Sequence, residues 1–406
     1  MQTINIALLV LCILSGLTGM AYLGFNSLAK WFILKRLVIS NTSHTFESWK
    51  SPPVSPHLKV FFFNISNPVQ VFDGLEKPHL IEMGPYTYRQ KWIKQNITFN
   101  TNGTISYKTR KIFTFSPTES CAGCSDVRDQ VTTLNVPAIS AYHHSRGASW
   151  LGKNALDIGI RHALGYRPWV RRPIYELLWG YEENLFKTAQ YLLPDPPPFD
   201  RFGLFMMMNS SQELGEFNMF TGEGNPDMLA SIYTFNHRRE LGFWNGSKCN
   251  AVRGSEGAFF KPYIKKTETL WFFSDRLCRS LPLVYHKSIT VKPEGLPGLR
   301  FVPRQDVFMS AERFPEKNSC FAGKDRLSGD GVFDLRACQF DSPIVLSWPH
   351  FLGAEQRFSG AVTGLNPEHG KHGFWFDIQA GDCLMSQKCM DFKHQQAPIL
   401  VWCGTF

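Results

Sequence analysis

The sequence predicts an α+β fold, in which an antiparallel β body carries one helical insertion and follows an N-terminal hydrophobic helix. Three observations predict it: an uncharged apolar run at the N-terminus, short strand-like runs separated by turn residues, and one stretch with apolar residues at helical spacing. The chain has 406 residues, 43% of them hydrophobic and 14% aromatic, and a net charge of +9. This composition excludes acidic disordered and collagen-like chains and favours one large globular domain.

The first element is a hydrophobic helix long enough to cross a membrane. No charged side chain occurs from Met1 to Ala29, and residues 4–26 are mostly apolar. A bilayer core needs about 20 apolar residues in a helix, whereas the apolar part of a cleaved signal peptide has about 7 to 15. We therefore predict a short tail at residues 1–3 and an uncleaved transmembrane helix at residues 4–26, with a cleaved signal peptide as the alternative.

Two signals disagree about the side of the membrane on which the body lies. Lys30, Lys35 and Arg36 follow the span and favour a cytoplasmic body by the positive-inside rule. Six N-x-Ser/Thr sequons favour export, because N-glycosylation occurs on the lumenal side. The predicted glycosylation sites are Asn41, Asn64, Asn96, Asn102, Asn209 and Asn245. Because six sequons agree, we predict an extracellular or lumenal body.

Short runs of β-branched and aromatic residues follow the span and predict strands. Among them are residues 58–65, 300–302, 343–348 and 373–378. Turn dipeptides separate these runs at short intervals and predict antiparallel connections. They are Asp73-Gly74, Gly84-Pro85, Asn102-Gly103, Asn245-Gly246 and Pro297-Gly298.

One region of the body combines helical spacing with a local excess of positive charge. Apolar residues recur at helical spacing over about residues 150–195, and Pro168 and Pro173 divide this region into short helices. Its first half contains only one acidic residue, Asp157, but five basic ones: Lys153, Arg161, Arg167, Arg171 and Arg172. A solvated helix face and a landing site for anionic ligands both explain this charge. No nucleic-acid-binding motif accompanies it, so we predict no nucleic-acid partner.

The sequence contains no recognisable catalytic or metal-binding motif. It has no G-x-S-x-G elbow in a strand-to-helix context, no H-E-x-x-H pair, no P-loop and no G-x-G-x-x-G. His143-His144 and the pair His369 and His372 lack a third ligand at a convincing spacing, so we interpret them as surface-loop histidines. We predict no enzymatic activity, no cofactor and no metal.

The ten cysteines fit an oxidising compartment. Cys12 lies in the predicted span, and the nine that remain leave at least one thiol free or intermolecular. The candidates for this thiol are Cys383, Cys389 and Cys403. Cys121 and Cys124 have C-x-x-C spacing without the βαβ context of a redox site, which favours a small local disulfide or two separate bridges. A lumenal hydrolase or C-x-x-C oxidoreductase is a minor alternative.

Several motifs occur in a characteristic order along the body. They are residues 46–88 with Phe62–Pro68 and Gly84–Tyr88, residues 176–181, 220–222, 272–280 and 300–302, and residues 349–367. In this order the motifs resemble the class B scavenger receptor family, of the fatty-acid translocase, lysosomal integral membrane protein and sensory neuron membrane protein type. The resemblance covers about residues 5–379.

The resemblance implies both a fold and a function. The fold is an ectodomain at residues 37–379 with an antiparallel β-barrel-like core, a helical apex at about residues 150–195 and a hydrophobic tunnel. The function is capture of lipids or lipoproteins at the apex and passage of lipid through the tunnel toward the membrane. The candidate ligand contacts are the apex cations Lys153, Arg161, Arg167, Arg171 and Arg172.

The implied partners are fatty acids, sterols, phospholipids or lipoproteins, together with the membrane itself. A homo-oligomer is a further candidate assembly. The plasma membrane is the predicted location, with the lysosomal membrane as the alternative. A non-transporting adhesive glycoprotein that binds protein partners and an inactive truncated isoform are the alternative functions.

The resemblance also implies two disulfides, Cys249–Cys320 and Cys278–Cys338. A third, small family bridge has no counterpart, because Ala322 stands where one partner is expected. Family members continue beyond the strand near residue 379 to a second transmembrane helix. Residues 380–406 do not show such a helix, and we interpret them as a divergent C-terminal segment of a truncated family member.

Overall fold

The computed structural model describes residues 2–52, 55–145, 168–186, 200–206, 208–209, 215–291, 295–323, 326–379 and 400–403. Its first elements are α1 (Gln2–Leu37), α2 (His44–Lys50), β1 (His57–Ile65), α3 (Pro68–Phe72), β2 (Leu80–Phe99), β3 (Thr104–Phe115), η1 (Pro117–Glu119), β4 (Gln130–Leu134), α4 (Val136–Ser145), β5 (Trp169–Pro173), α6 (Ile174–Trp179), β6 (Tyr181–Glu182) and β7 (Arg201–Phe202).

The second half is built from shorter elements. They are β8 (Phe217–Phe220), η2 (Pro226–Met228), β9 (Ile232–Phe235), α8 (Ser247–Asn250), β10 (Leu270–Ser274), β11 (Arg279–Val291), β12 (Leu296–Pro303), α9 (Pro315–Asn318), η3 (Ser319–Phe321), β13 (Val332–Asp334), η4 (Arg336–Cys338), β14 (Ile344–Ser347), η5 (Pro349–Phe351), α10 (Gln356–Ser359), α11 (His369–His372), β15 (Phe376–Gln379) and β16 (Leu400–Cys403).

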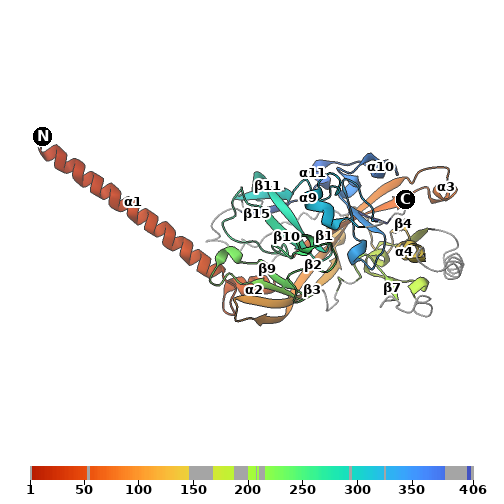
Figure 1. Cartoon of the computed structure of the whole chain (residues 1–406), viewed down its shortest axis with the longest axis horizontal. Helices are drawn as coiled ribbons and strands as arrows, with labels where there is room; N and C mark the ends of the chain where they lie inside the picture. The colour runs from red at the N-terminus through yellow and green to blue at the C-terminus, as the bar shows by residue number, and fades with distance from the viewer. Residues whose placement is uncertain are drawn as a thin grey trace.

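Helix α1 has 36 residues and projects away from the body (Figure 1). At its C-terminal end the Thr45 hydroxyl of α2 donates a 2.9 Å hydrogen bond to the carbonyl oxygen of Arg36. The backbone of the predicted span at residues 4–26 is helical throughout, but most of its side chains lie outside the described residues. Within what the structure describes, no helix combines the length and apolar character that a bilayer crossing needs.

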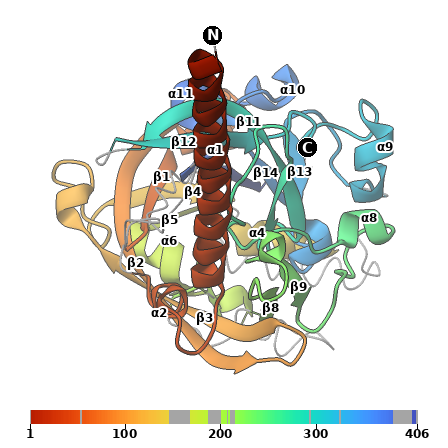
Figure 2. The same cartoon turned by 90° about the vertical axis from the view of Figure 1, so that its left-hand side faces the viewer.

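Three antiparallel sheets form most of the body. They have the strand orders β1-β2-β3-β8-β9, β10-β11-β12-β15 and β13-β14-β16, and the ribbons β4-β5 and β6-β7 are added to them. The larger sheets are curled (Figure 2). The antiparallel α+β prediction is therefore confirmed, with β1 and β14 close to their predicted bounds and β15 beginning three residues late.

Two of the predicted turn dipeptides lie inside strands instead. Gly84-Pro85 belongs to β2, opposite a register shift between Val60 and Phe62 of β1. Gly84 has a φ of 136°, and a Cβ there would lie 2.8 Å from the Val60 carbonyl oxygen, so the close approach of two strands requires glycine. Pro297 pairs with Thr290 of β11 on one side of β12, whereas β15 on the other side pairs with β12 from Gly298 onward. The missing N–H of Pro297 therefore falls outside the pairing of β12 with β15.

The predicted helical apex is replaced in part by a strand. Residues 169–173 form β5 and pair with β4, from Trp169 opposite Leu134 to Pro173 opposite Gln130. The adjacent Trp169-Val170 favours β structure, and pairing with β4 prevails over the helical spacing of the surrounding residues. Helix α6 follows directly, as the short-helix prediction requires. Residues 146–167 and 187–199, which include most of the predicted apex, lie outside the described residues.

Two buried tyrosines fix the β4-β5 ribbon against the five-stranded sheet. The hydroxyls of Tyr86 and Tyr88 in β2 donate to Asp129 at 2.9 Å and to Asp126 at 2.7 Å. Burial and these carboxylates raise the pKa of both hydroxyls, so they remain donors. Figure 1 shows β4, which pairs with β5, at the end of the body opposite α1.

Candidate functional site

The structure places two of the five predicted ligand contacts at the end of the body opposite α1. Arg171 and Arg172 lie on β5, which pairs with β4, and Figure 1 shows β4 at that end. The other three cations, Lys153, Arg161 and Arg167, lie outside the described residues. The pair was expected on a short helix and is instead on a strand.

The strand separates the two arginines by role. Arg171 is exposed, whereas Arg172 is half-buried, because successive side chains of a strand face opposite sides. The Arg172 Nη1 lies 3.6 Å from Glu176 Oε2, and its guanidinium carbon lies 4.9 Å from the centre of the Tyr181 ring. Arg171 is thus available to a ligand, while Arg172 helps to hold the ribbon on α6.

A buried ion pair lies in the aromatic interior beneath β2 and β3. Lys94 Nζ is 2.5 Å from Glu256 Oε1, and the two side chains are 1% and 15% exposed. The same ammonium group donates to Thr109 Oγ1 at 2.9 Å and lies 4.3 Å from the centre of the Tyr107 ring. Trp49, at 5.3 Å, closes a second side. The pair therefore joins the five-stranded sheet to the segment that precedes β10.

Burial sets the electrostatics of this pair. It lowers the pKa of the Lys94 ammonium group, and the Glu256 carboxylate opposes that shift. Burial also raises the pKa of the Tyr107 hydroxyl, with Glu256 adding to the effect. Sequence reasoning missed Lys94, although it lies in phase with the inward-facing Tyr88 and Gln90 of the same strand, a period-2 signal that could have found it.

The comparisons with known proteins decide the family. The sequence model of the CD36 family matches residues 6–381 of this chain. The chain belongs to the CD36 family. Scavenger receptor class B member 1 of Cricetulus griseus is 34% identical over 353 residues, which cover 87% of this chain and 67% of that protein. Lysosome membrane protein 2 of Mus musculus is 33% identical over 352 residues, covering 85% and 70%.

Among the described residues, three disulfides brace the body of this CD36-family chain. Cys249 is bonded to Cys320 and Cys278 to Cys338, the pairs that the family resemblance implies. Cys121 is bonded to Cys124, which resolves the C-x-x-C spacing as a local bridge. Cys383 and Cys389 lie outside the described residues, and Cys403 lies on β16 opposite Ile344.

The expectation of a surface-loop His372 was wrong. His372 is only 9% exposed, and its ring stacks on His350 with the ring centres 4.1 Å apart. His350 Nε2 lies 2.5 Å from Glu82 Oε2 of β2, so the three side chains join the chain after β14 to the first hairpin. The partners are 268 or more residues apart from Glu82 in sequence, and no local spacing reveals them. His369 of the same short helix is exposed.

The Glu82–His350–His372 cluster has the residue types of a metal site but the wrong proton arrangement. Nδ1 of His350 accepts from the backbone N–H of Asn366 at 3.0 Å, and Nδ1 of His372 accepts from that of Glu368 at 2.9 Å. A neutral imidazole whose Nδ1 is an acceptor carries its proton on Nε2, which then has no lone pair for a metal. The cluster therefore acts as a hydrogen-bonded clasp in this arrangement.

The clasp predicts a loss of stability in mild acid. Burial, and then the neighbouring His350, lower the pKa of His372, although Glu82 and Glu368 oppose the shift and Lys371 adds to it. His372 of the unfolded chain therefore binds a proton near pH 6.5, whereas His372 of the folded chain binds it only at a lower pH. We expect the free energy of unfolding to fall as the pH decreases from 7 to 5, by at most about 1.4 kcal/mol per pH unit for this group.

Urea unfolding at several pH values measures this effect. His372→Gln keeps an acceptor for the Glu368 N–H and should flatten the pH dependence. His369→Gln, in the same helix but exposed, should leave the dependence as it is in the unmodified chain. Equal curves for all three proteins would contradict the clasp.

The six predicted glycosylation sites divide into two groups by exposure. Asn41, Asn96, Asn102 and Asn245 are exposed. Asn64 and Asn209 are half-buried, and their side-chain oxygens accept backbone N–H bonds from Thr132 at 2.9 Å and from Phe113 at 3.2 Å. A glycan is bulky and needs a surface position, so the exposed group is the better acceptor set.

We expect glycans on the exposed asparagines when the full chain is expressed in secretory-competent cells. Peptide N-glycosidase converts a glycosylated Asn to Asp, and peptide mass spectrometry in heavy-oxygen water then marks each occupied site. Asn41→Gln should increase the gel mobility of the intact chain by the amount that corresponds to the loss of one glycan. A chain with no marked asparagine would place the body on the cytoplasmic side.

Proposed function

We propose that this protein is a class B scavenger receptor that captures lipids or lipoproteins at the end opposite α1 and passes lipid through its interior toward a membrane. The single observation that carries the proposal is the exposed position of Arg171 on β5, the strand that pairs with β4; Figure 1 shows β4 at that end. An exposed cation there favours anionic lipid and lipoprotein surfaces. Lys153, Arg161 and Arg167 are proposed to extend the same basic surface.

We infer the membrane part of the proposal from the sequence of α1. Its 36 residues correspond to a length of about 54 Å, which exceeds the roughly 30 Å of a bilayer core. The segment from Met1 to Ala29 has no charged side chain. With α1 in the bilayer, the β4-β5 ribbon would face away from the membrane, toward particles that approach from the extracellular or lumenal side.

We propose that an apolar cargo passes along the aromatic interior, whose buried rings pack against one another. Trp49, Tyr107, Phe217 and Phe273 are buried next to one another, and Tyr107 contacts Trp49 at a ring-centre distance of 4.7 Å and Phe217 at 5.8 Å. Acyl chains and sterols require apolar walls of this kind. The plasma membrane is the proposed location, with the lysosomal membrane as the alternative.

Capture by the basic surface is tested with immobilised lipoprotein and with anionic vesicles. We expect Arg171→Ala to weaken binding a few-fold and the combined change of Lys153, Arg161, Arg167 and Arg171 to alanine to weaken it at least tenfold. Arg172→Ala should lower the free energy of unfolding by about 1 kcal/mol, because it removes a half-buried ion pair and a cation–π contact.

Lys287→Ala is the matched control, because Lys287 is an exposed cation on β11. It should bind like the unmodified chain. If the fourfold variant also binds like the unmodified chain, the apex is not the capture site. Binding of protein partners that survives removal of all lipid would instead support the adhesive alternative.

A further inference from the structure

A basic pocket lies on the flank of the body between α8 and the α9–η3 segment, which Figure 2 shows on the same side of the molecule. Its volume of about 70 Å³ is room for about five water-sized spheres. Its walls come from α8 and the loop that follows it, from β10 and β11, and from the chain after β12. The charged lining residues are Lys248, Arg253, Arg279, Arg304, Lys317 and Asp306.

Arg279 is the buried cation of this pocket. It is 4% exposed, its Nη1 donates to the Val307 carbonyl oxygen at 3.1 Å, and its Nε has no hydrogen-bond partner within the described part of the chain. The guanidinium carbon lies 3.9 Å from the centre of the Phe321 ring and 4.6 Å from that of Phe333. Among the residues that the structure describes, no carboxylate lies within ion-pair distance of Arg279.

Burial does not remove this charge. It lowers the pKa of Arg279 to about 9, an effect that Asp306 opposes and Arg304 increases. The group therefore remains cationic at neutral pH. A buried cation without a partner is costly, and such a group in a cavity points to a ligand of opposite charge.

Asp306, the one carboxylate among the described lining residues, is already engaged. Asp306 Oδ1 lies 2.7 Å from Arg304 Nε, and its Oδ2 lies 3.1 Å from Lys317 Nζ. Burial alone would raise the pKa of Asp306, but hydrogen bonds from Arg304 and Lys317 prevail and the pKa is lowered. Asp306 is thus shared between Arg304 and Lys317, and its single negative charge cannot balance these two cations and Arg279 together.

Two exposed cations form the rim of the pocket. Lys248 donates through Nζ to the carbonyl oxygen of Glu316, and the Arg253 guanidinium lies 5.2 Å from the centre of the Trp271 ring. No ion pair joins either of them to a carboxylate in the described part of the chain. The rim and the buried Arg279 can therefore both donate to one anion.

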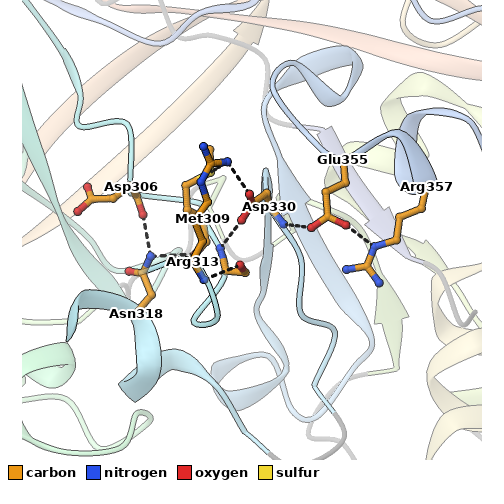
Figure 3. Close-up of polar contacts among 8 residues, drawn as sticks. Asp306, Met309, Arg313, Asn318, Asp330, Glu355 and Arg357 are labelled. Atoms are coloured by element: carbon orange, nitrogen blue, oxygen red, sulfur yellow. Dashed lines mark hydrogen bonds and ion pairs between the residues drawn. The ribbon is translucent and has the colours of Figure 1, made fainter. Parts of the chain in front are cut away.

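The pocket is held in shape before any ligand arrives. The Cys249–Cys320 disulfide joins its two sides. Asn318 Nδ2 donates at 2.8 Å to the carbonyl oxygens of both Asp306 and Met309, as Figure 3 shows. The network continues away from the pocket. Arg313 forms an ion pair with Asp330 at 2.7 Å, and Arg357 forms one with Glu355 at 2.6 Å. The Asp330 N–H donates to the Glu355 carboxylate at 2.6 Å and joins the two pairs. Preorganised donors bind an anion without first being ordered.

We propose that this pocket binds a phosphate group, with Arg279 at its buried end and Lys248 and Arg253 at its rim. Guanidinium groups match phosphate oxygens in geometry and charge, and the five heavy atoms of phosphate fit the space. The phosphate can belong to inorganic phosphate or to the head group of an anionic phospholipid. The site is separate from Arg171 and goes beyond the proposed function, because it requires no lipid transfer.

Calorimetric titration of the detergent-solubilised full chain with inorganic phosphate tests the site at constant ionic strength. We expect saturable binding of one phosphate per chain and at least a tenfold loss of affinity in Arg279→Met. Because Arg279 is buried, Lys248→Met with Arg253→Met is the second variant; it changes only exposed side chains and should weaken binding several-fold. Lys287→Met, on the exposed part of β11, should bind like the unmodified chain.

Vesicles distinguish the two sources of phosphate. Phosphatidylcholine vesicles with and without phosphatidic acid are incubated with the unmodified chain and the rim variant. If inorganic phosphate binds and phosphatidic acid does not increase vesicle binding, the ligand is a free anion. If the chain binds vesicles with phosphatidic acid and inorganic phosphate competes with that binding, the ligand is a lipid head group. The proposal is wrong if neither inorganic phosphate nor phosphatidic acid binds, or if both pocket variants bind as strongly as the unmodified chain.

Discussion

Glu256→Gln should lower the free energy of unfolding by about 3–5 kcal/mol at pH 7, because it leaves the buried Lys94 ammonium group without its anionic partner. Glutamine keeps the shape of the side chain, so the loss reflects charge rather than packing. Burial already lowers the pKa of Lys94, and removal of Glu256 removes the group that opposes this shift. The effect should therefore exceed that of any exposed charge change in the chain.

The pH dependence gives this prediction a sign. The folded variant holds its Lys94 proton less tightly than the unfolded chain does, so raising the pH toward the ordinary lysine pKa of about 10.4 restores stability.

Adding Lys94→Met to Glu256→Gln should recover most of the loss, since no unpaired charge is left. Lys91→Met, an exposed change on the same strand, is the control and should cost less than about 0.5 kcal/mol. Chemical denaturation measures all four proteins, and a Glu256→Gln loss no larger than that of the control would contradict the buried pair.

Removal of the Cys249–Cys320 bridge should have a second large effect. The bridge spans a sequence separation of 71 residues and Cys278–Cys338 one of 60, so loop-closure entropy assigns each about 4 kcal/mol. Cys121–Cys124 spans only three residues, and the same relation gives it about 2 kcal/mol. The pairs are replaced by alanine one bridge at a time, and denaturant midpoints under oxidising conditions are compared.

The order of the three bridges is the informative result. We expect both long bridges to cost more than the short one, and loss of Cys249–Cys320 also to weaken phosphate binding, because this bridge joins the two sides of the pocket. A short bridge that costs as much as the long ones would contradict the loop-closure account. Reduction of the intact chain should reproduce the loss seen in the long-bridge variants.

Local patterns predicted local structure well. The alternating run at residues 58–65 became β1, and Asn102-Gly103 joins β2 to β3 as a turn. Residues 169–173 were misassigned because helical spacing of apolar residues extended across them, while their β structure depends on pairing with β4, which is distant in sequence. Gly84-Pro85 has the composition of a turn, but the close approach of β1 decides its conformation.

The candidate sites depended more strongly on tertiary contacts. The basic apex was visible as a run of charge, yet only the strand reveals that Arg171 is exposed while Arg172 contacts Glu176. The histidine clasp joins Glu82 to residues more than 260 positions away, and the phosphate pocket assembles cations from four separate segments. Residue spacing along the sequence does not predict contacts between such distant segments. The ordered family motifs, in contrast, did identify the fold.

Lipid binding by the purified chain is the most direct test of the central claim. The full chain is delipidated in detergent, returned to nanodiscs and titrated with a radiolabelled fatty acid and a radiolabelled sterol. The account predicts saturable binding of at least one lipid per chain, which is lost on unfolding and competed by the unlabelled lipid. Lipid counts that rise linearly without saturation, or that match those of empty nanodiscs, would contradict it.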